Sequence, residues 1–289
     1  MNILIDIITY AAPVGFACYG GLLSEKVGIV QISLEGMMLI GALAAVIATS
    51  ITGNPMVGVC AAMACAMLAA ALHNLFTLVM RSDHVIVGTA VNFLAIGITG
   101  VLSRTLQKSH PTILKAQSLP LLVSGMNVLT MLFILLIPSL WWLLYRTRLG
   151  IGIAATGELP KAVTAAGYSV FRYRFFASLA CGAFCGLGGA ALSIGISNNF
   201  TDNMTASRGF VALALIVVGR WSPLWTAIGT LAFAGLDVFQ ASLQASGNTW
   251  LPYPILLALP YILTLVALGT AKASVRPPRY LGITTESQS

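Results

Sequence analysis

The chain has little charge for its length. Of its 289 residues, 8% are Asp, Glu, Lys or Arg, whereas 58% are hydrophobic, and the mean hydropathy is +0.91. Such a composition is too apolar for a soluble domain and is typical of a protein that crosses the membrane many times. The sequence therefore predicts an all-α polytopic membrane protein.

The sequence also lacks the motifs of several enzyme classes. No lysine follows a glycine, which excludes a GxxxxGK[ST] phosphate-binding loop, and the three histidines form no HExxH motif. The five cysteines lie inside apolar runs without a CxxC pair, so we interpret them as packing residues. We expect this chain to contain no catalytic residues, no metal site and no bound cofactor.

Apolar runs define the expected membrane spans, because a helix needs about 20 residues to cross the bilayer. Nine runs qualify: 3–23, 30–50, 56–79, 85–103, 124–145, 174–196, 207–220, 224–243 and 252–270. We predict about nine spans, within a range of eight to ten. The short run at 207–220 predicts a half-helix that is buried against its neighbours. The spans form one predicted transmembrane domain, 1–273, followed by a cytoplasmic tail, 274–289.

The basic residues predict an orientation. If the 146–174 segment is cytoplasmic, that side has Lys26, Arg81, Arg146, Arg148, Lys161, Arg172, Arg174, Arg220, Lys272, Arg276 and Arg279. The other side has only Arg104, Lys108, Lys115 and Arg208. This asymmetry places the C-terminus in the cytoplasm. The net charge of +7 therefore reflects membrane topology and does not indicate a nucleic-acid partner.

The stretch SEKVGIVQISLEG, residues 24–36, contains two of the eight acidic residues between two apolar runs. Glu25 fits the cytoplasmic end of the first span. Ser33 is predicted to cap the next helix, and Glu35 in its first turn is favoured by the helix dipole. A polar break before a helix start is also typical of broken transporter helices. We predict a hinge or re-entrant break here, with Glu35 as a gate residue.

Polar side chains inside other spans have two interpretations. Thr89 and Asn92 share one face of the fourth run, and Asp237, Gln240 and Gln244 share one face of the eighth. Such groups line a pathway or form hydrogen bonds between helices. Small residues also recur every four positions in the sixth run, which predicts close helix packing. They are Ser178, Gly182, Gly186 and Ala190.

The segment 146–174 is predicted to contain a short helix, PKAVTAA. Pro160 suits a first helical position, and Gly167 suits the residue just past the end. A short helix on a basic cytoplasmic segment has a shape that can dock into another protein. A surface helix that caps the bundle is the alternative interpretation.

Four ordered motifs resemble a known family. SEKVGIVQISLEGMMLIGA, HVIVGTAVNFLA, TGELPKAVTAAGYSVFRYR and NMTASRGFVALALIVVGRW with SPLWTAIGTLAFAGLDVFQ look like the membrane permease subunits of bacterial ATP-binding-cassette (ABC) importers. More narrowly, they are similar to the shorter permease of the nucleoside and simple-sugar branch.

The resemblance implies partners and a location. It implies a bacterial inner-membrane protein that pairs with a second permease, a cytoplasmic ATPase that binds the ATP, and an extracytoplasmic solute-binding lipoprotein. The coupling helix of the family falls on Gly157, Glu158, Lys161, Ala165, Ala166 and Gly167.

We predict a nucleoside as the solute, because the branch includes nucleoside importers and because amides and aromatic rings suit a base. Simple sugars and riboflavin-like compounds remain open. The predicted pathway residues are Glu35, Thr89, Asn92, Phe210, Asp237 and Gln240. Two other classes are considered: an ion-coupled secondary transporter that uses the intramembrane carboxylates, and a membrane assembly subunit that transports nothing.

Overall fold

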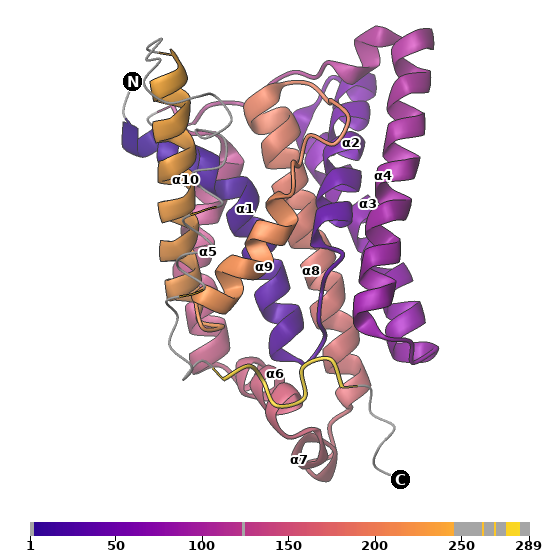
Figure 1. Ribbon diagram of the computed structural model, residues 1–289, viewed down its shortest axis with the longest axis vertical. Coiled ribbons are helices and arrows are strands. Elements are labelled where there is room, and N and C mark those ends of the chain that lie inside the picture. Colours follow the sequence, from indigo (N-terminus) through magenta and orange to yellow (C-terminus); the bar gives the residue numbers. More distant parts are fainter. Residues whose placement is uncertain (1–2, 123–124, 246–261, 263–268, 270–275, 284–289) are drawn as a thin grey trace.

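The computed structural model describes residues 3–122, 125–245, 262, 269 and 276–283 (Figure 1). The α-helices have the following bounds: α1 (Ile3–Lys26), α2 (Leu34–Thr52), α3 (Pro55–Asn74), α4 (His84–Ser109), α5 (Val128–Arg146), α6 (Arg148–Glu158), α7 (Pro160–Ala165), α8 (Val170–Leu192), α9 (Arg208–Val218) and α10 (Pro223–Ala245). Two π-helical turns, η1 (Leu75–Val79) and η3 (Ser193–Ser197), extend α3 and α8, and a 3₁₀ turn, η2 (Pro111–Leu114), follows α4.

Seven helices in the described part are long and apolar enough to cross a membrane: α1, α2, α3 with η1, α4, α5, α8 with η3, and α10. Each matches a predicted run, so the all-α polytopic fold is confirmed. Helix α9 has only 11 residues, in agreement with the predicted half-helix. The predicted ninth run, 252–270, lies almost entirely outside the described residues.

Close packing around α8 explains its small residues. A Cβ atom on Gly186 would lie 2.5 Å from the carbonyl oxygen of Ala62, and one on Gly182 would lie 2.8 Å from that of Ala66, both on α3. No side chain fits at such distances, so the glycines let two helix backbones approach closely. The small-residue stripe on α8 therefore packs helices, as predicted.

Two helices start inside the bundle rather than at its ends. Residues 27–33 leave α1 and pass into the molecule before α2 begins, and residues 198–207 do the same before α9 (Figure 1). The predicted break after the first span is therefore present, and a second break precedes the half-helix. These two breaks position the candidate site.

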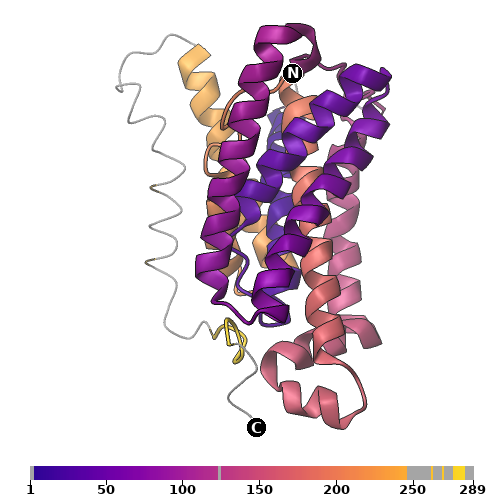
Figure 2. The ribbon, with the colours of Figure 1, turned by 90° about the vertical axis from the view of Figure 1, so that its right-hand side faces the viewer.

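The two short helices α6 and α7 lie at one end of the bundle. Figures 1 and 2 show α6 and α7 there, and residues 276–283 lie at the same end. The amide of Tyr280 donates to the carbonyl of Gly157 at 2.8 Å, and the amide of Gly282 donates to that of Gly28 at 2.9 Å. The last described segment thus ties α6 to the break after α1.

Helix α6 was not predicted, since its sequence was interpreted as part of a loop. Thr147 caps it by accepting a hydrogen bond from the amide of Gly150 at 3.2 Å. A Cβ atom on Gly150 would lie 2.2 Å from the carbonyl oxygen of Leu143 on α5, and one on Gly152 would lie 2.3 Å from the hydroxyl of Tyr173 on α8. These glycines lower helix propensity but allow α6 to pack tightly against both helices.

Candidate functional site

The chain bends sharply before α9. Asn203, Ala206 and Ser207 all have positive φ angles, of 56°, 46° and 65°, although none is a glycine. Such a conformation costs roughly 1 kcal/mol or more for each residue and persists only where neighbouring structure fixes it. The side chain of Ser207, at the N-cap position, forms no cap hydrogen bond within the part of the chain described. The amide of Arg208 bonds to the carbonyl of Thr205 and that of Phe210 to the carbonyl of Ser207, whereas the amide of Gly209 needs an acceptor from another element.

Glu35 on α2 is that acceptor. Its Oε1 atom accepts hydrogen bonds from the hydroxyl of Thr205 at 2.5 Å and from the amide of Ser207 at 2.9 Å. Its Oε2 atom accepts from the amide of Gly209 at 2.7 Å. The side chain is buried, and a carboxylate at a helix N-terminus is also favoured by the helix dipole. Glu35 thus caps α9 from outside it and fixes the strained turn.

Asn92 on α4 has the same role at the start of α2. Its Oδ1 atom accepts from the amide of Gly36 at 2.8 Å, and its Nδ2 atom donates to the carbonyl of Ile32 at 2.9 Å. The prediction that Ser33 caps α2 is wrong, because the Ser33 hydroxyl instead accepts from Nε2 of Gln31 at 2.8 Å. The amide of a distant asparagine replaces the local cap.

Glycines make both contacts sterically possible. A Cβ atom on Gly209 would lie 2.4 Å from the backbone nitrogen of Glu35, and one on Gly36 would lie 2.9 Å from Oδ1 of Asn92. Both glycines sit in the first turn of their helices, where the capping side chain approaches. We call Asn92, Gly36, Glu35, Ser207 and Gly209 the helix-start junction. It joins α4, α2 and α9 at the two breaks.

The other end of α9 contacts the second acidic residue of the 24–36 stretch. Nε1 of Trp221 donates to Oε2 of Glu25 at 2.5 Å, and both side chains are buried. Arg220 and Trp221, which follow α9, again have positive φ angles, of 54° and 52°. The half-helix is therefore bonded near one end to Glu35 and near the other to Glu25, which gives both carboxyl groups a structural role.

The remaining predicted pathway residues lie on α9, α10 and α4. Oδ2 of Asp237 is 3.7 Å from Nη2 of Arg208, so an ion pair joins α10 to the first residue of α9. Phe210, two residues further along α9, is 46% exposed. The hydroxyl of Thr89 bonds to its own helix, at the carbonyl of Val85, and Gln240 is partly buried one turn beyond Asp237.

The structure therefore brings together four of the six predicted pathway residues around the first turn of α9. Glu35 bonds to that turn, Asp237 pairs with it, Phe210 belongs to it, and Asn92 bonds to the residue after Glu35. Thr89 and Gln240 lie one turn away from this group on their own helices.

The predicted coupling residues surround α7, which projects from one end of the molecule (Figure 2). Five of them are exposed: Glu158, Lys161, Ala165, Ala166 and Gly167. The sixth, Gly157, is buried, and a Cβ atom there would lie 2.2 Å from the carbonyl oxygen of Lys26. Gly167 has a φ of 80°, which suits the predicted position past the helix end. Gly157 therefore contacts the end of α1 instead of the surface.

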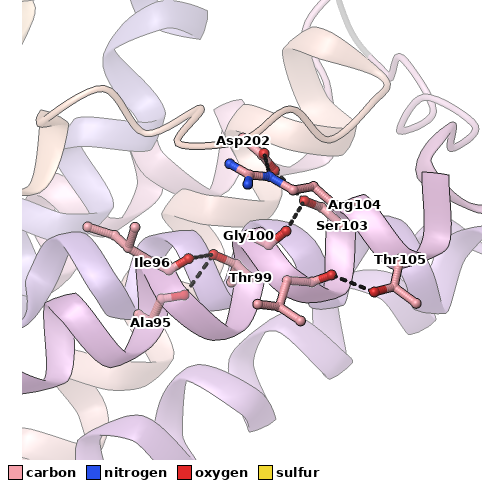
Figure 3. A network of polar contacts seen from close by, with 9 residues as sticks. Ala95, Ile96, Thr99, Gly100, Ser103, Arg104, Thr105 and Asp202 are labelled. Atoms are coloured by element: carbon pink, nitrogen blue, oxygen red, sulfur yellow. Dashed lines mark hydrogen bonds and ion pairs between the residues drawn. The ribbon is translucent and has the colours of Figure 1, made fainter. Parts of the chain in front are cut away.

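A further contact anchors the loop before α9 to the last turns of α4 (Figure 3). The carboxylate of Asp202 accepts hydrogen bonds from the hydroxyl of Ser103 and from Nε of Arg104, the latter at 3.1 Å. The Ser103 hydrogen bond, followed by the Arg104 contact, holds the pKa of Asp202 below its usual value of 3.8. Sequence patterns did not identify these residues, nor Thr205, Gly209 and Trp221, because their partners are distant in the chain.

Seven apolar helices, a buried half-helix and a projecting short helix define a multi-pass membrane protein. Residues 3–268 match the family described as the permease component of the branched-chain amino acid transport system. The chain belongs to this family of transport-system permeases, and as a permease subunit it is not itself an enzyme.

Several curated proteins are similar over most of the chain. The guanosine ABC transporter permease protein NupQ of Bacillus subtilis is 32% identical, over 96% of this chain and 93% of its own length. The nucleoside ABC transporter permease protein NupC of Lactococcus lactis is 29% identical, over 97% and 95%. The putative glucose ABC transporter permease protein TsgC13 of Haloferax volcanii is 30% identical, over 87% and 86%. No solved structure matches the chain.

Proposed function

We propose that this permease moves a nucleoside across the bacterial inner membrane. The observation that carries this proposal is the similarity to guanosine and nucleoside permeases over almost the whole chain. The exposed ring of Phe210 suits stacking on a base, and Gln240 offers an amide for hydrogen bonds. The pathway passes the first turn of α9, with Asp237, Asn92 and Thr89 nearby.

A simple sugar is the second candidate solute, favoured by the similarity to the putative glucose permease. The two are separated by titrating the partner lipoprotein with guanosine, adenosine and glucose in a calorimeter. We expect micromolar or tighter binding of a nucleoside. Binding of glucose without any nucleoside would overturn the first choice and leave the permease function intact.

The transporter contains further subunits in this proposal. A second permease packs beside this chain in the membrane, an ATPase binds ATP on the cytoplasmic side, and a lipoprotein delivers the solute from outside. The end that has α6 and α7 faces the cytoplasm, in line with the excess of Lys and Arg there. Purification in mild detergent followed by native mass spectrometry should show the ATPase and the second permease bound.

Motion is transmitted from the ATPase through α7 in this proposal. The exposed residues Glu158, Ala165 and Ala166 contact the ATPase, and buried Gly157 passes the movement to the carbonyl of Lys26 at the end of α1. The break after α1 leads to Glu35 and so to the start of α9. Glu35 then acts as the gate residue, since its three hydrogen bonds must differ between the two access states for the states to be coupled.

Substitutions of exposed residues that flank α7 test this transmission of motion. We expect the double variant Glu158→Ala, Gly167→Ala to lose uptake of labelled guanosine in cells while keeping its level in the membrane. Gly53→Ala is the matched control for Gly167→Ala, because both glycines have positive φ angles, 69° and 80°, and open space around the Cβ position. Normal uptake in the double variant would contradict the docking role of α7.

Energy coupling distinguishes the rival classes. Uptake should stop when the ATPase subunit is deleted and should continue when the ion gradients are collapsed. Uptake with the opposite pattern would indicate an ion-coupled secondary transporter that uses Asp237 or Glu35. If a photoreactive nucleoside never cross-links near Asn92 or Gln240, a non-transporting assembly subunit is favoured.

A further inference from the structure

A cavity lies away from α9, between α7, the start of α8 and the connection from α3 to α4. Its volume is about 540 Å³. Three basic residues line it: Arg81 after η1, Lys161 on α7 and Arg174 on α8. The lining residues in the described chain include no Asp or Glu. The nearby Asp83 caps α4, where its Oδ1 atom accepts from the amides of Val85 and Ile86 at 2.8 and 3.0 Å.

Some buried polar atoms in this lining lack a hydrogen-bond partner among the residues described. Arg174 is only 3% exposed; its Nε donates to the carbonyl of Val27 at 3.2 Å and its Nη1 to that of Ile283 at 3.4 Å. Its Nη2 has no hydrogen-bond partner among the residues described, and the same is true of both ring nitrogens of buried His84. A buried guanidinium nitrogen without an acceptor is unfavourable. Because Arg174 lines the cavity together with Arg81 and Lys161, the charge of the lining favours an anion there.

The rest of the lining indicates which anion fits. Leu78, Val170 and Phe171 form an apolar part of the cavity wall, and Phe171 is 49% exposed. Basic pockets between membrane helices bind lipid headgroups, because the phosphate meets the cations while the glycerol and chains meet apolar side chains. Arginine is the side chain best shaped to hold a phosphate through paired hydrogen bonds.

We propose that this cavity binds the phosphate group of an anionic phospholipid. Arg174 and Arg81 hold the phosphate from the bundle, and Lys161 holds it from α7. The bound headgroup thus braces α7 against η1, α4 and α8. The site is separate from the solute pathway, and its occupancy sets how firmly α7 is held at the angle from which it projects.

The test measures lipid binding to the purified full chain and needs no transport. The protein in mild detergent is titrated with short-chain phosphatidylglycerol or phosphatidylcholine, and bound lipid is counted by native mass spectrometry. Phosphatidylglycerol should bind more tightly than phosphatidylcholine. In the variant Arg81→Gln, Lys161→Gln its affinity should fall about thirtyfold, since each cation near an anionic lipid contributes about fivefold. Arg174 is left unchanged because its other hydrogen bonds support the fold.

The matched control is Arg148→Gln, Arg172→Gln, which removes the same charge from exposed residues outside the cavity lining. It should keep its affinity within about twofold. An equal loss in both variants would show general surface attraction and overturn the site. Binding of glycerol 3-phosphate without binding of phosphatidylglycerol would overturn the lipid as ligand. Because no solute is present, these results do not depend on whether the permease moves a nucleoside.

Discussion

Helices α2 and α9 begin at breaks in the chain, and the starts of both are completed by a side chain from another helix. The amide of Asn92 serves α2, whereas the carboxylate of Glu35 serves α9. The amide both accepts and donates, so it closes the first break with one bond on each side of the helix start. The carboxylate only accepts, and it collects three donors from one strained turn.

The difference indicates distinct roles for the two starts. A neutral amide with both groups paired is a fixed structural joint. A buried carboxylate is held by charge-assisted hydrogen bonds and the dipole of α9, so any movement of α9 away from α2 must give Glu35 new partners. The start of α9 is therefore the joint at which a change of state has the largest energetic consequence.

Removing the carboxylate should have the largest effect. Glu35→Ala leaves the Thr205 hydroxyl and two backbone amides without their acceptor, which should lower the free energy of unfolding by about 4 kcal/mol. Denaturation of the purified chain in detergent measures this loss. Guanosine uptake should be abolished.

The variant Glu35→Gln distinguishes a gating role of Glu35 from its role in capping α9. Glutamine keeps one acceptor oxygen but removes the charge, so uptake should fall more than stability. If uptake and stability fall equally, the role of Glu35 is only to cap α9, and the starts of α2 and α9 do not differ in function.

Asn92→Leu tests the neutral joint. The substitution leaves the Gly36 amide and the Ile32 carbonyl unpaired in a buried position, which should cost about 3 kcal/mol of stability. Thr89→Val is the matched control on the same helix, because the Thr89 hydroxyl bonds only within α4; it should change stability by less than about 1 kcal/mol. Asn92→Leu should reduce uptake only in proportion to its loss of folded protein. A specific transport defect in well-folded Asn92→Leu would show that the start of α2, like that of α9, has a role in transport.

Paired glycine substitutions compare the closeness of the two contacts. Gly209→Ala should destabilise by about 2 kcal/mol, and Gly36→Ala by about 1 kcal/mol, since the added carbon meets backbone in the first case and mainly side chains in the second. Gly97→Ala on α4 has open space and should stabilise by roughly 0.5–1 kcal/mol. Thermal unfolding of the three variants gives the order of their stabilities. An unchanged unfolding temperature in Gly209→Ala would show that the first turn of α9 does not pack closely against α2.

The sequence predicted the features that depend on local pattern. Apolar length identified the spans, the short run at 207–220 identified the half-helix, and Pro160 with Gly167 identified α7. Sequence patterns could not predict contacts between residues that are distant in the chain, such as the bond of the Glu35 side chain to Ser207, 172 positions away. Ser33 shows the same limit, since it occupies the N-cap position but its hydroxyl accepts from Gln31.

The contact of Asp202 with α4 should give the smallest effect, because it holds the same loop as Glu35 but near the surface. The Asp202 and Arg104 side chains are 42% and 75% exposed, so solvent and salt screen the pair, and Asp202→Asn should cost less than about 1 kcal/mol at pH 7. The lowered pKa of Asp202 means that its contribution is present above pH 3.8 and is lost as the pH falls through the lower value of the folded state. Unfolding of both proteins at pH 7 and pH 3, with and without 1 M salt, measures this. The difference in free energy of unfolding between wild type and Asp202→Asn should shrink in acid and in salt. The loss of stability in Glu35→Ala should persist in salt, because that carboxylate is buried. If salt also reduced the loss in Glu35→Ala, the two carboxylates would not differ as we infer.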